Sequence, residues 1–163
     1  MVDRPYVELL RALDAARVEL AIAGGFAVVL HGVPRMTFDL DIVVDDDDAN
    51  MRRLVDVLDK QGFRPRLPVP LQDLANAQTR RDWIENRNLI AFNLTHPTRP
   101  MEELDVILVS PFPWEEVARS RVWRSVDGVR VPVIGRGLLR RMKLASGRDK
   151  DLSDAELLGD GDD

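Results

Sequence analysis

Apolar residues recur at two different periods along this 163-residue chain, and the two periods separate helices from strands. Helical spacing after Pro5 predicts an amphipathic helix over 5–16. A second apolar stripe, from Met51 to Leu58, predicts a helix that is capped by the acidic run 45–48 and ends at Gly62. The remaining helices are predicted at 26–31, 71–86, 113–119, 137–146 and 152–158.

Strands are predicted where apolar and polar residues alternate. In the segment 36–44, the side chains of Phe38, Leu40, Ile42 and Val44 alternate with those of Thr37, Asp39, Asp41 and Val43. Shorter strands are predicted at 19–23, 89–95, 104–109, 123–125 and 129–133, with a hairpin turn at Asp127-Gly128 and antiparallel pairing across 89–109. The predicted fold class is therefore α+β, with a mixed or antiparallel sheet flanked by helices.

Composition narrows the class of protein. Length predicts a single domain over 1–158, with a helical C-terminal part near 137–158 and a disordered tail over 159–163. No apolar run is long enough to cross a bilayer, no signal peptide is visible, and there is no cysteine, so a cytoplasmic location is expected. The net charge of −5 argues against a general nucleic-acid coat.

Candidate chemistry begins with two carboxylates on the strand at 36–44. Asp39 and Asp41 share one face of that strand, about 6.5 Å apart, and would repel each other without a cation between them. Asp105 is a lone acid in a later apolar strand. If the two strands are neighbours, three carboxylates converge, and such a set can hold two Mg²⁺ ions, or Mn²⁺, for phosphoryl-type transfer.

The glycine pair Gly24-Gly25 lies between a predicted strand and a predicted helix. Glycines at that place let backbone N–H groups approach a phosphate closely. Arg35, Lys143 and Lys150 are candidates for further contacts with a triphosphate.

Each feature alone has an ordinary structural explanation. An Asp-X-Asp pair is more often a solvated strand face, and Asp105 could pair with Arg124 or Arg130. Lys143 could be a surface lysine. The combination and its order are what indicate a nucleotide site.

The combination resembles a known group. Gly24-Gly25, then Arg35-X-Thr37, then Asp39-Leu40-Asp41 and a later Asp105 resemble the DNA polymerase beta-like nucleotidyltransferase superfamily. More narrowly, the segments 23–32 and 35–42 resemble minimal nucleotidyltransferases and the abortive-infection (AbiEii-type) nucleotidyltransferase toxins of toxin–antitoxin systems. The segment 142–154 is similar to their later lysine-and-aspartate motif.

The resemblance implies transfer of a nucleoside monophosphate from a nucleoside triphosphate (NTP) to an acceptor hydroxyl. It implies that Gly24, Gly25, Arg35 and Thr37 contact the nucleotide, together with Lys143 and Lys150. Asp39, Asp41 and Asp105 would be the catalytic metal ligands, and Asp105 could also act as general base. Lys143 would neutralise phosphate charge or brace the acids, and Asp151 and Asp154 match the later motif without an assigned role.

Two departures from the superfamily are visible. Many members carry serine where this chain has Gly25, so a hydroxyl contact to phosphate is missing there. The chain also ends soon after the last motif, and no large domain is expected that would select an acceptor such as tRNA.

Three functions compete. The first is a magnesium-dependent, pyrophosphate-releasing nucleotidyltransferase that acts on RNA, a protein or a small molecule; the resemblance also allows it to be one half of a toxin–antitoxin pair with a cognate partner. The second is a non-catalytic relative that binds a protein through the basic run 136–143 and Trp114 or Trp123. The third is an adenylyltransferase that modifies a sugar or an antibiotic.

Overall fold

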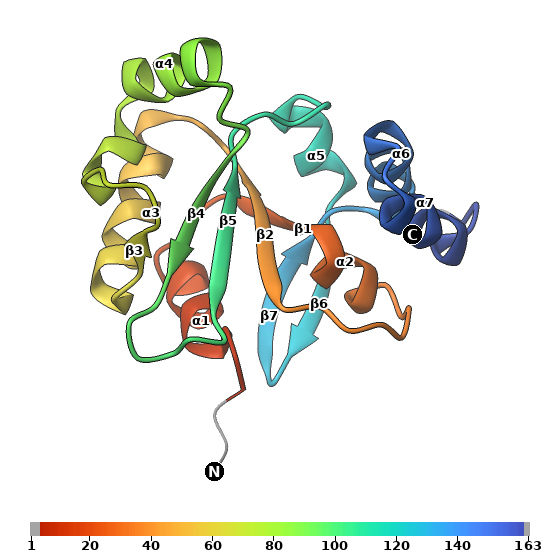
Figure 1. Ribbon diagram of the computed structural model, residues 1–163. Coiled ribbons are helices and arrows are strands. Elements are labelled where there is room, and N and C mark those ends of the chain that lie inside the picture. Colours follow the sequence, from red (N-terminus) through yellow and green to blue (C-terminus); the bar gives the residue numbers. More distant parts are fainter. Residues whose placement is uncertain (1–3, 162–163) are drawn as a thin grey trace.

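The computed structural model describes residues 4–161, and the chain forms helices and strands in mixed order (Figure 1). The elements are α1 (Val7–Ala15), β1 (Leu20–Ala23), α2 (Gly24–Leu30), β2 (Asp39–Val44), α3 (Asp48–Gln61), β3 (Arg64–Pro65), the 3-10 helix η1 (Leu71–Ala75), α4 (Ala77–Arg87), β4 (Ala91–Thr95), β5 (Glu103–Ile107), α5 (Trp114–Ser120), β6 (Val122–Val126), β7 (Val129–Val133), α6 (Arg136–Ser146) and α7 (Asp149–Leu158).

One mixed sheet organises the molecule. Its seven strands lie in the order β3-β4-β5-β2-β1-β7-β6. β2 runs parallel to β5 and antiparallel to β1, and β1 runs parallel to β7. The β4–β5 and β6–β7 pairs are antiparallel, as the turns in the sequence predict. The predicted α+β class, with a mixed sheet flanked by helices, is confirmed.

The two faces of the sheet have different roles. Figure 1 shows α1 behind β4 and β5, α3 at the left beyond β4, α2 in front of the sheet near β1, and α6 and α7 at the right. Even-numbered residues of β2 and β5, such as Leu40, Ile42, Leu104 and Val106, are fully buried in the core. Odd-numbered residues of the same strands point to the opposite face. That second face carries Asp39, Asp41 and Asp105.

Several predicted boundaries differ from the observed ones by one to three residues; for example, α7 begins at Asp149 and not at 152, and β4 begins at Ala91 and not at 89. The strand predicted at 36–44 begins only at Asp39, so Phe38 is largely exposed instead of packing in the core. The helix predicted at 71–86 is divided into η1 and α4, because Asn76 is extended and its side chain accepts a hydrogen bond from the Thr79 amide. The short strand β3 was not predicted, since Pro65 is unfavourable for strand pairing.

The described part of the tail lies close to α6. Residues 162 and 163 of the predicted disordered tail lie outside the described residues, whereas the Asp160 carboxylate is 3.2 Å from the Arg140 guanidinium. Between residues 4 and 161, no helix combines the length and the apolar character needed to cross a membrane.

Tyr6 joins the two strands that carry the acids. Its hydroxyl donates to the Phe38 carbonyl and accepts from the Glu103 amide at 2.9 Å, at the entrance to β2 and β5. Burial raises the pKa of Tyr6 to about 12. The ring packs edge-on against Phe26 of α2. One buried hydroxyl thus sets the starting points of both strands.

We expect Tyr6→Phe to lower the free energy of unfolding by about 1–2 kcal/mol, because the two backbone groups lose their shared partner while the ring stays packed. Urea denaturation of the two proteins at neutral pH measures the difference. An unchanged denaturation midpoint would show that the hydroxyl does not hold the strands together.

Candidate active site

Four carboxylates form a two-by-two array on the open face of the sheet. Because β2 and β5 are parallel and in register, Asp39 lies beside Glu103 and Asp41 lies beside Asp105. Along each strand the two acids are separated by one buried leucine, so all four side chains emerge on the same face. The expected proximity of Asp105 to the Asp39–Asp41 strand is therefore observed.

Like charges dominate the electrostatics of this array. The pKa of Asp41 is raised to about 7, chiefly by burial and then by the neighbouring Asp105 and Asp39 carboxylates. The Lys143 ammonium group opposes this shift. The Asp105 carboxylate lies close enough for hydrogen bonding with Asp41, and this contact also raises the pKa of Asp41. Burial and a hydrogen bond to Asp39 also raise the pKa of Glu103. Without a bound cation, Asp41 therefore carries a proton in a substantial fraction of the molecules at neutral pH.

The two acids of β5 have polar partners on the side of the sheet that carries β4 and β3. Asn93 of β4 lies opposite Asp105 and donates its amide to that carboxylate at 2.7 Å. The Arg66 guanidinium forms an ion pair with Glu103. The arginines considered as partners of Asp105 lie elsewhere: Arg124 donates to the Leu30 carbonyl and Arg130 stacks on Trp123.

The glycine pair begins α2, beside the acids. Gly24 has a φ of +62°, and a Cβ atom there would lie 1.8 Å from Asp41 Oδ2, so only glycine leaves room for that carboxylate. A Cβ atom at Gly25 would lie 2.6 Å from Thr37 Oγ1. The Thr37 hydroxyl therefore lies close to where a serine side chain at position 25 would extend, which gives a physical reason for the glycine.

The later motif forms a buried ionic cluster behind the array. Lys143 of α6 lies 2.9 Å from Asp151 and 3.1 Å from Asp154, both on α7. Asp154 also forms an ion pair with Arg35. Burial alone would raise the pKa of Asp151, but hydrogen bonds from Ser146, Lys143 and Arg148 lower it to about 2. The two aspartates thus hold Lys143 and Arg35 in position from behind.

A cleft of about 870 Å³ lies over the acid array. The predicted site residues that line it are Gly24, Gly25, Arg35, Thr37, Asp39, Asp41, Asp105, Lys143, Lys150 and Asp151. Asp154 does not line it and lies beneath the cationic side chains. Lys150 is exposed on α7.

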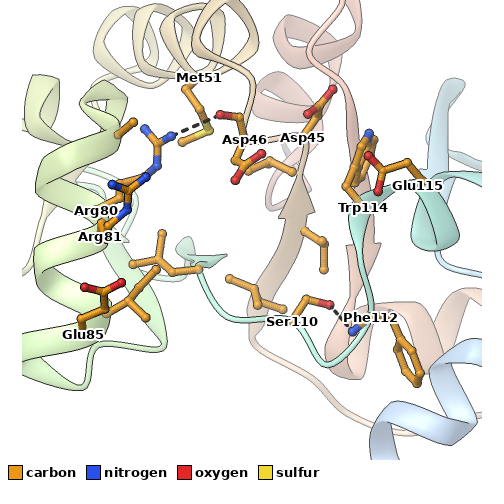
Figure 2. Close-up of a pocket in the computed structure, with 16 residues that line it drawn as sticks. Asp45, Asp46, Met51, Arg80, Arg81, Glu85, Ser110, Phe112, Trp114 and Glu115 are labelled. Carbon is orange, nitrogen blue, oxygen red and sulfur yellow. Dashed lines mark hydrogen bonds between the residues drawn. The ribbon is translucent and has the colours of Figure 1, made fainter.

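A second cleft, of about 420 Å³, opens between α4 and α5 (Figure 2). Arg80, Arg81 and Glu85 approach it from α4, and Trp114 and Glu115 approach it from the opposite side. None of the predicted site residues lines it. The acidic run that was predicted to cap α3 does so through Asp47, which accepts from the Ala49 and Asn50 amides.

The donor set suits a hard cation. In the described part of the chain, no three acidic or histidine side chains are grouped closely enough to enclose an ion as they stand. Asp41 and Asp105 are nevertheless in contact, Asp39 is on the same face, and carboxylate oxygens are the ligands that Mg²⁺ prefers. The buried Asn93 Oδ1, which has no hydrogen-bond partner among the described residues, is a further oxygen near Asp105.

Two members of this site were not predicted from the sequence. Glu103-Leu104-Asp105 repeats the acid-leucine-acid pattern of β2, and that repetition was the available signal. Asn93 carried no such signal, because its role depends on the register between β4 and β5.

The fold and its acid-bearing cleft are those of a nucleotidyltransferase. The family model of aminoglycoside-2''-adenylyltransferases matches residues 6–156, and the chain belongs to this family. The match confirms the nucleotidyltransferase superfamily and the enzyme class; it does not extend to the abortive-infection toxins in particular. None of the curated proteins compared with the chain matches it.

Solved structures agree on the fold. The antibiotic-resistance factor ANT(2'')-Ia aligns with 93% of this chain and 78% of its own, at 14% identity and a TM-score of 0.60. The lincosamide antibiotic adenylyltransferase LnuA, solved with lincomycin, aligns over 94% of both chains at 14% identity and a TM-score of 0.59. An antigenic nucleotidyltransferase-like protein from Paracoccidioides brasiliensis aligns with 93% of this chain and 72% of its own, at 20% identity and a TM-score of 0.59.

We expect Asp154→Ala to lower the free energy of unfolding by about 3–5 kcal/mol, since Lys143 and Arg35 are left as buried cations with a lost counter-charge. The matched control is Glu156→Ala, two residues further along α7 and exposed, which should change stability by less than about 0.5 kcal/mol. Urea denaturation compares them. Equal effects of the two substitutions would contradict the proposed bracing role of Asp154.

Asp41 should make the stability of the cation-free protein depend on pH. Its pKa of about 7 in the folded state exceeds the ordinary value of 3.8, so the folded protein binds the proton more tightly than the unfolded chain does. The stabilisation is complete below about pH 4 and is lost as the pH rises to about 7. Relative to Asp41→Asn, the unaltered protein should therefore lose stability, on the order of a few kcal/mol, between these pH values.

Urea denaturation in EDTA at several pH values between 4 and 8 measures this difference. Parallel stability curves for the two proteins would mean that Asp41 has an ordinary pKa in the folded state.

Proposed function

We propose that this protein transfers a nucleoside monophosphate from an NTP to a hydroxyl group of a small molecule. The observation that carries the proposal is the in-register pairing of β2 and β5, which brings Asp41 against Asp105 beside the Gly24-Gly25 turn. Like-charged carboxylates in contact need a cation, and a glycine turn with cationic neighbours suits a triphosphate. The family match supports the same chemistry.

One set of residues in the cleft binds the triphosphate, and a second set binds the divalent cations. Backbone amides at Gly24 and Gly25, with the Arg35, Lys143 and Lys150 side chains, bind the triphosphate. Asp39, Asp41 and Asp105 would hold divalent cations, Mg²⁺ or Mn²⁺, and a cation bound there would neutralise charge on the transferred phosphate and favour ionisation of the acceptor hydroxyl. The raised pKa of Asp41 fits a site that exchanges protons for such a cation.

The transfer step is an in-line displacement. The acceptor hydroxyl oxygen forms a bond to the α-phosphorus, the bond from that phosphorus to the bridging α–β oxygen breaks, and pyrophosphate leaves. Asp105 lies on the side of the array nearest β4 and accepts the hydroxyl proton, which then passes to water. The chain's own contribution is mostly orientation and charge compensation.

The family match favours one of the acceptors that the sequence left open. Its members are named for adenylyl transfer to aminoglycosides, ANT(2'')-Ia has been solved with adenylyl-2''-tobramycin, and LnuA has been solved with lincomycin. These are small hydroxyl-bearing antibiotics, so a small molecule is a better candidate than tRNA or a partner protein. A toxin–antitoxin role draws no support from this match.

We expect Asp41→Asn and Asp105→Asn each to lower transfer of labelled nucleotide at least a thousandfold, on the order of 4 kcal/mol in activation free energy, while the fold is retained. The control is Asp59→Asn, an exposed acid on α3. The activity of each variant is measured as transfer of label from α-labelled ATP, GTP, CTP and UTP to a panel of hydroxyl-bearing antibiotics. Circular dichroism verifies that each variant is folded. Full activity of either variant would end the assignment.

A further inference from the structure

The two walls of the active-site cleft differ in chemistry. One wall, formed by the loop between α2 and β2 and by α6 and α7, presents the cations Arg35, Lys143, Arg148 and Lys150. The other wall, formed where β4 begins and β5 ends, presents Ile90, Ala91, Ile107, Val109 and Pro111, and we call these five residues the apolar wall. The acids lie between the two walls.

The apolar wall begins directly beside Asp105. Ile107 follows Asp105 by two residues on β5, so the two side chains share a face at a spacing of about 6.5 Å. Ala91 pairs with Ile107 across the strands. The Val109 amide donates to the Ile90 carbonyl at 3.2 Å, which places these two residues side by side at the end of the wall.

Ile90 and Val109 are unusually exposed for their types, at 69% and 46%. Isolated exposed apolar residues are common, but here they are adjacent and border a cleft. A molecule whose hydroxyl reaches Asp105 on the side away from the triphosphate would rest its body on this wall.

Charge decides which molecules fit. Of the described residues that line the cleft, the acidic ones are Asp39, Asp41, Asp105 and Asp151. The first three are the candidate cation ligands, and Asp151 is already neutralised by Lys143 and Arg148. A molecule with several ammonium groups would therefore find no free counter-charge near the apolar wall, and losing water from those groups would cost affinity.

Acids that could receive ammonium groups lie in the second cleft instead. Figure 2 shows Asp45, Asp46, Glu85 and Glu115 around that cleft. Ile107 lines both clefts, and the segment 108–112 separates them beyond it: Val109 and Pro111 line the active-site cleft, while Leu108, Ser110 and Phe112 line the second one. Asp105 does not line the second cleft.

Within the proposed function, on which this inference rests, we infer that the acceptor is a hydroxyl compound with an apolar face and at most one positive charge, and is not a polycationic aminoglycoside. Its hydroxyl oxygen bonds to the α-phosphorus as pyrophosphate leaves, its proton passes to Asp105, and its apolar face covers Ile90, Ala91, Ile107 and Val109. The chain thus departs in acceptor class from the name of its family.

The test compares two acceptors with the full chain and Mg²⁺. Lincomycin is a sugar-containing hydroxyl compound with one amine and an apolar ring substituent, whereas tobramycin carries many amines. With labelled ATP, or whichever NTP is used best, kcat/KM should be at least about tenfold higher for lincomycin, as expected when one aliphatic side chain is covered.

Variants of the wall sharpen the comparison. Ile90→Glu and Val109→Glu each place a carboxylate on the wall at an exposed position, so folding is not at risk. Each should lower kcat/KM for lincomycin about tenfold or more, raise it for tobramycin, and leave the Kd for the NTP unchanged. Met101→Glu is the matched control, because Met101 is 60% exposed and does not line the cleft; it should change none of these values.

The outcomes separate the inference from the proposed function. A higher kcat/KM for tobramycin than for lincomycin in the unaltered protein would overturn the inference and leave nucleotidyl transfer standing. If Ile90→Glu weakened NTP binding and left the acceptor KM unchanged, the wall would hold the nucleobase, and the inference would fail.

Absence of NTP binding by calorimetry in the unaltered protein would instead refute the proposed function. If NTP binds but no acceptor receives label, calorimetry with lincomycin and a non-reactive NTP analogue decides the inference. Binding that Ile90→Glu weakens and Met101→Glu does not would support it, and absence of binding would overturn it.

Discussion

The repulsion among acids on adjacent parallel strands is the constraint around which the rest of this molecule is arranged. Parallel register places Asp39 beside Glu103 and Asp41 beside Asp105, on a face that is partly shielded from water. Such an arrangement is unfavourable unless protons or cations are taken up. The hydroxyl of Tyr6 holds β2 and β5 together where the two strands begin. The register of the β2–β5 pair then keeps the four carboxylates close to one another.

Charge compensation connects the array to the end of the chain. The α6–α7 pair places Lys143 near the acids, and its ammonium group partly offsets the rise in the pKa of Asp41. Lys143 is itself buried, so it needs Asp151 and Asp154, and Asp154 in turn holds Arg35. Burying these charges costs free energy, and nothing within the α6–α7 pair alone requires it. The later motif is therefore explained by the support it gives to the cations on one wall of the cleft.

The sequence predicted those parts of the site that depend on local pattern. Alternation identified the β2 acids, and Gly24 could be expected to lie at a tight turn. The parallel pairing of β2 with β5 joins residues more than sixty positions apart, and this pairing cannot be predicted from a local sequence pattern. Glu103 and Asn93 became members of the site only through that register and the β4–β5 register. Phe38 followed the alternation but precedes the strand, so pattern alone placed it wrongly in the core.

The acid array also limits how the cleft can choose an acceptor. If the carboxylates of the array are the ligands of divalent cations, they are not free to recognise the amines of a substrate, and selectivity must come from the surfaces beside them. Here the surface beyond Asp105 is aliphatic, through Ile107, Val109 and Ile90. A shared phosphoryl-transfer centre and an independent acceptor wall are separable parts of one fold, because the first is fixed by strand register and the second by side chains at strand ends. Members of one family can then keep the reaction and differ in what they modify.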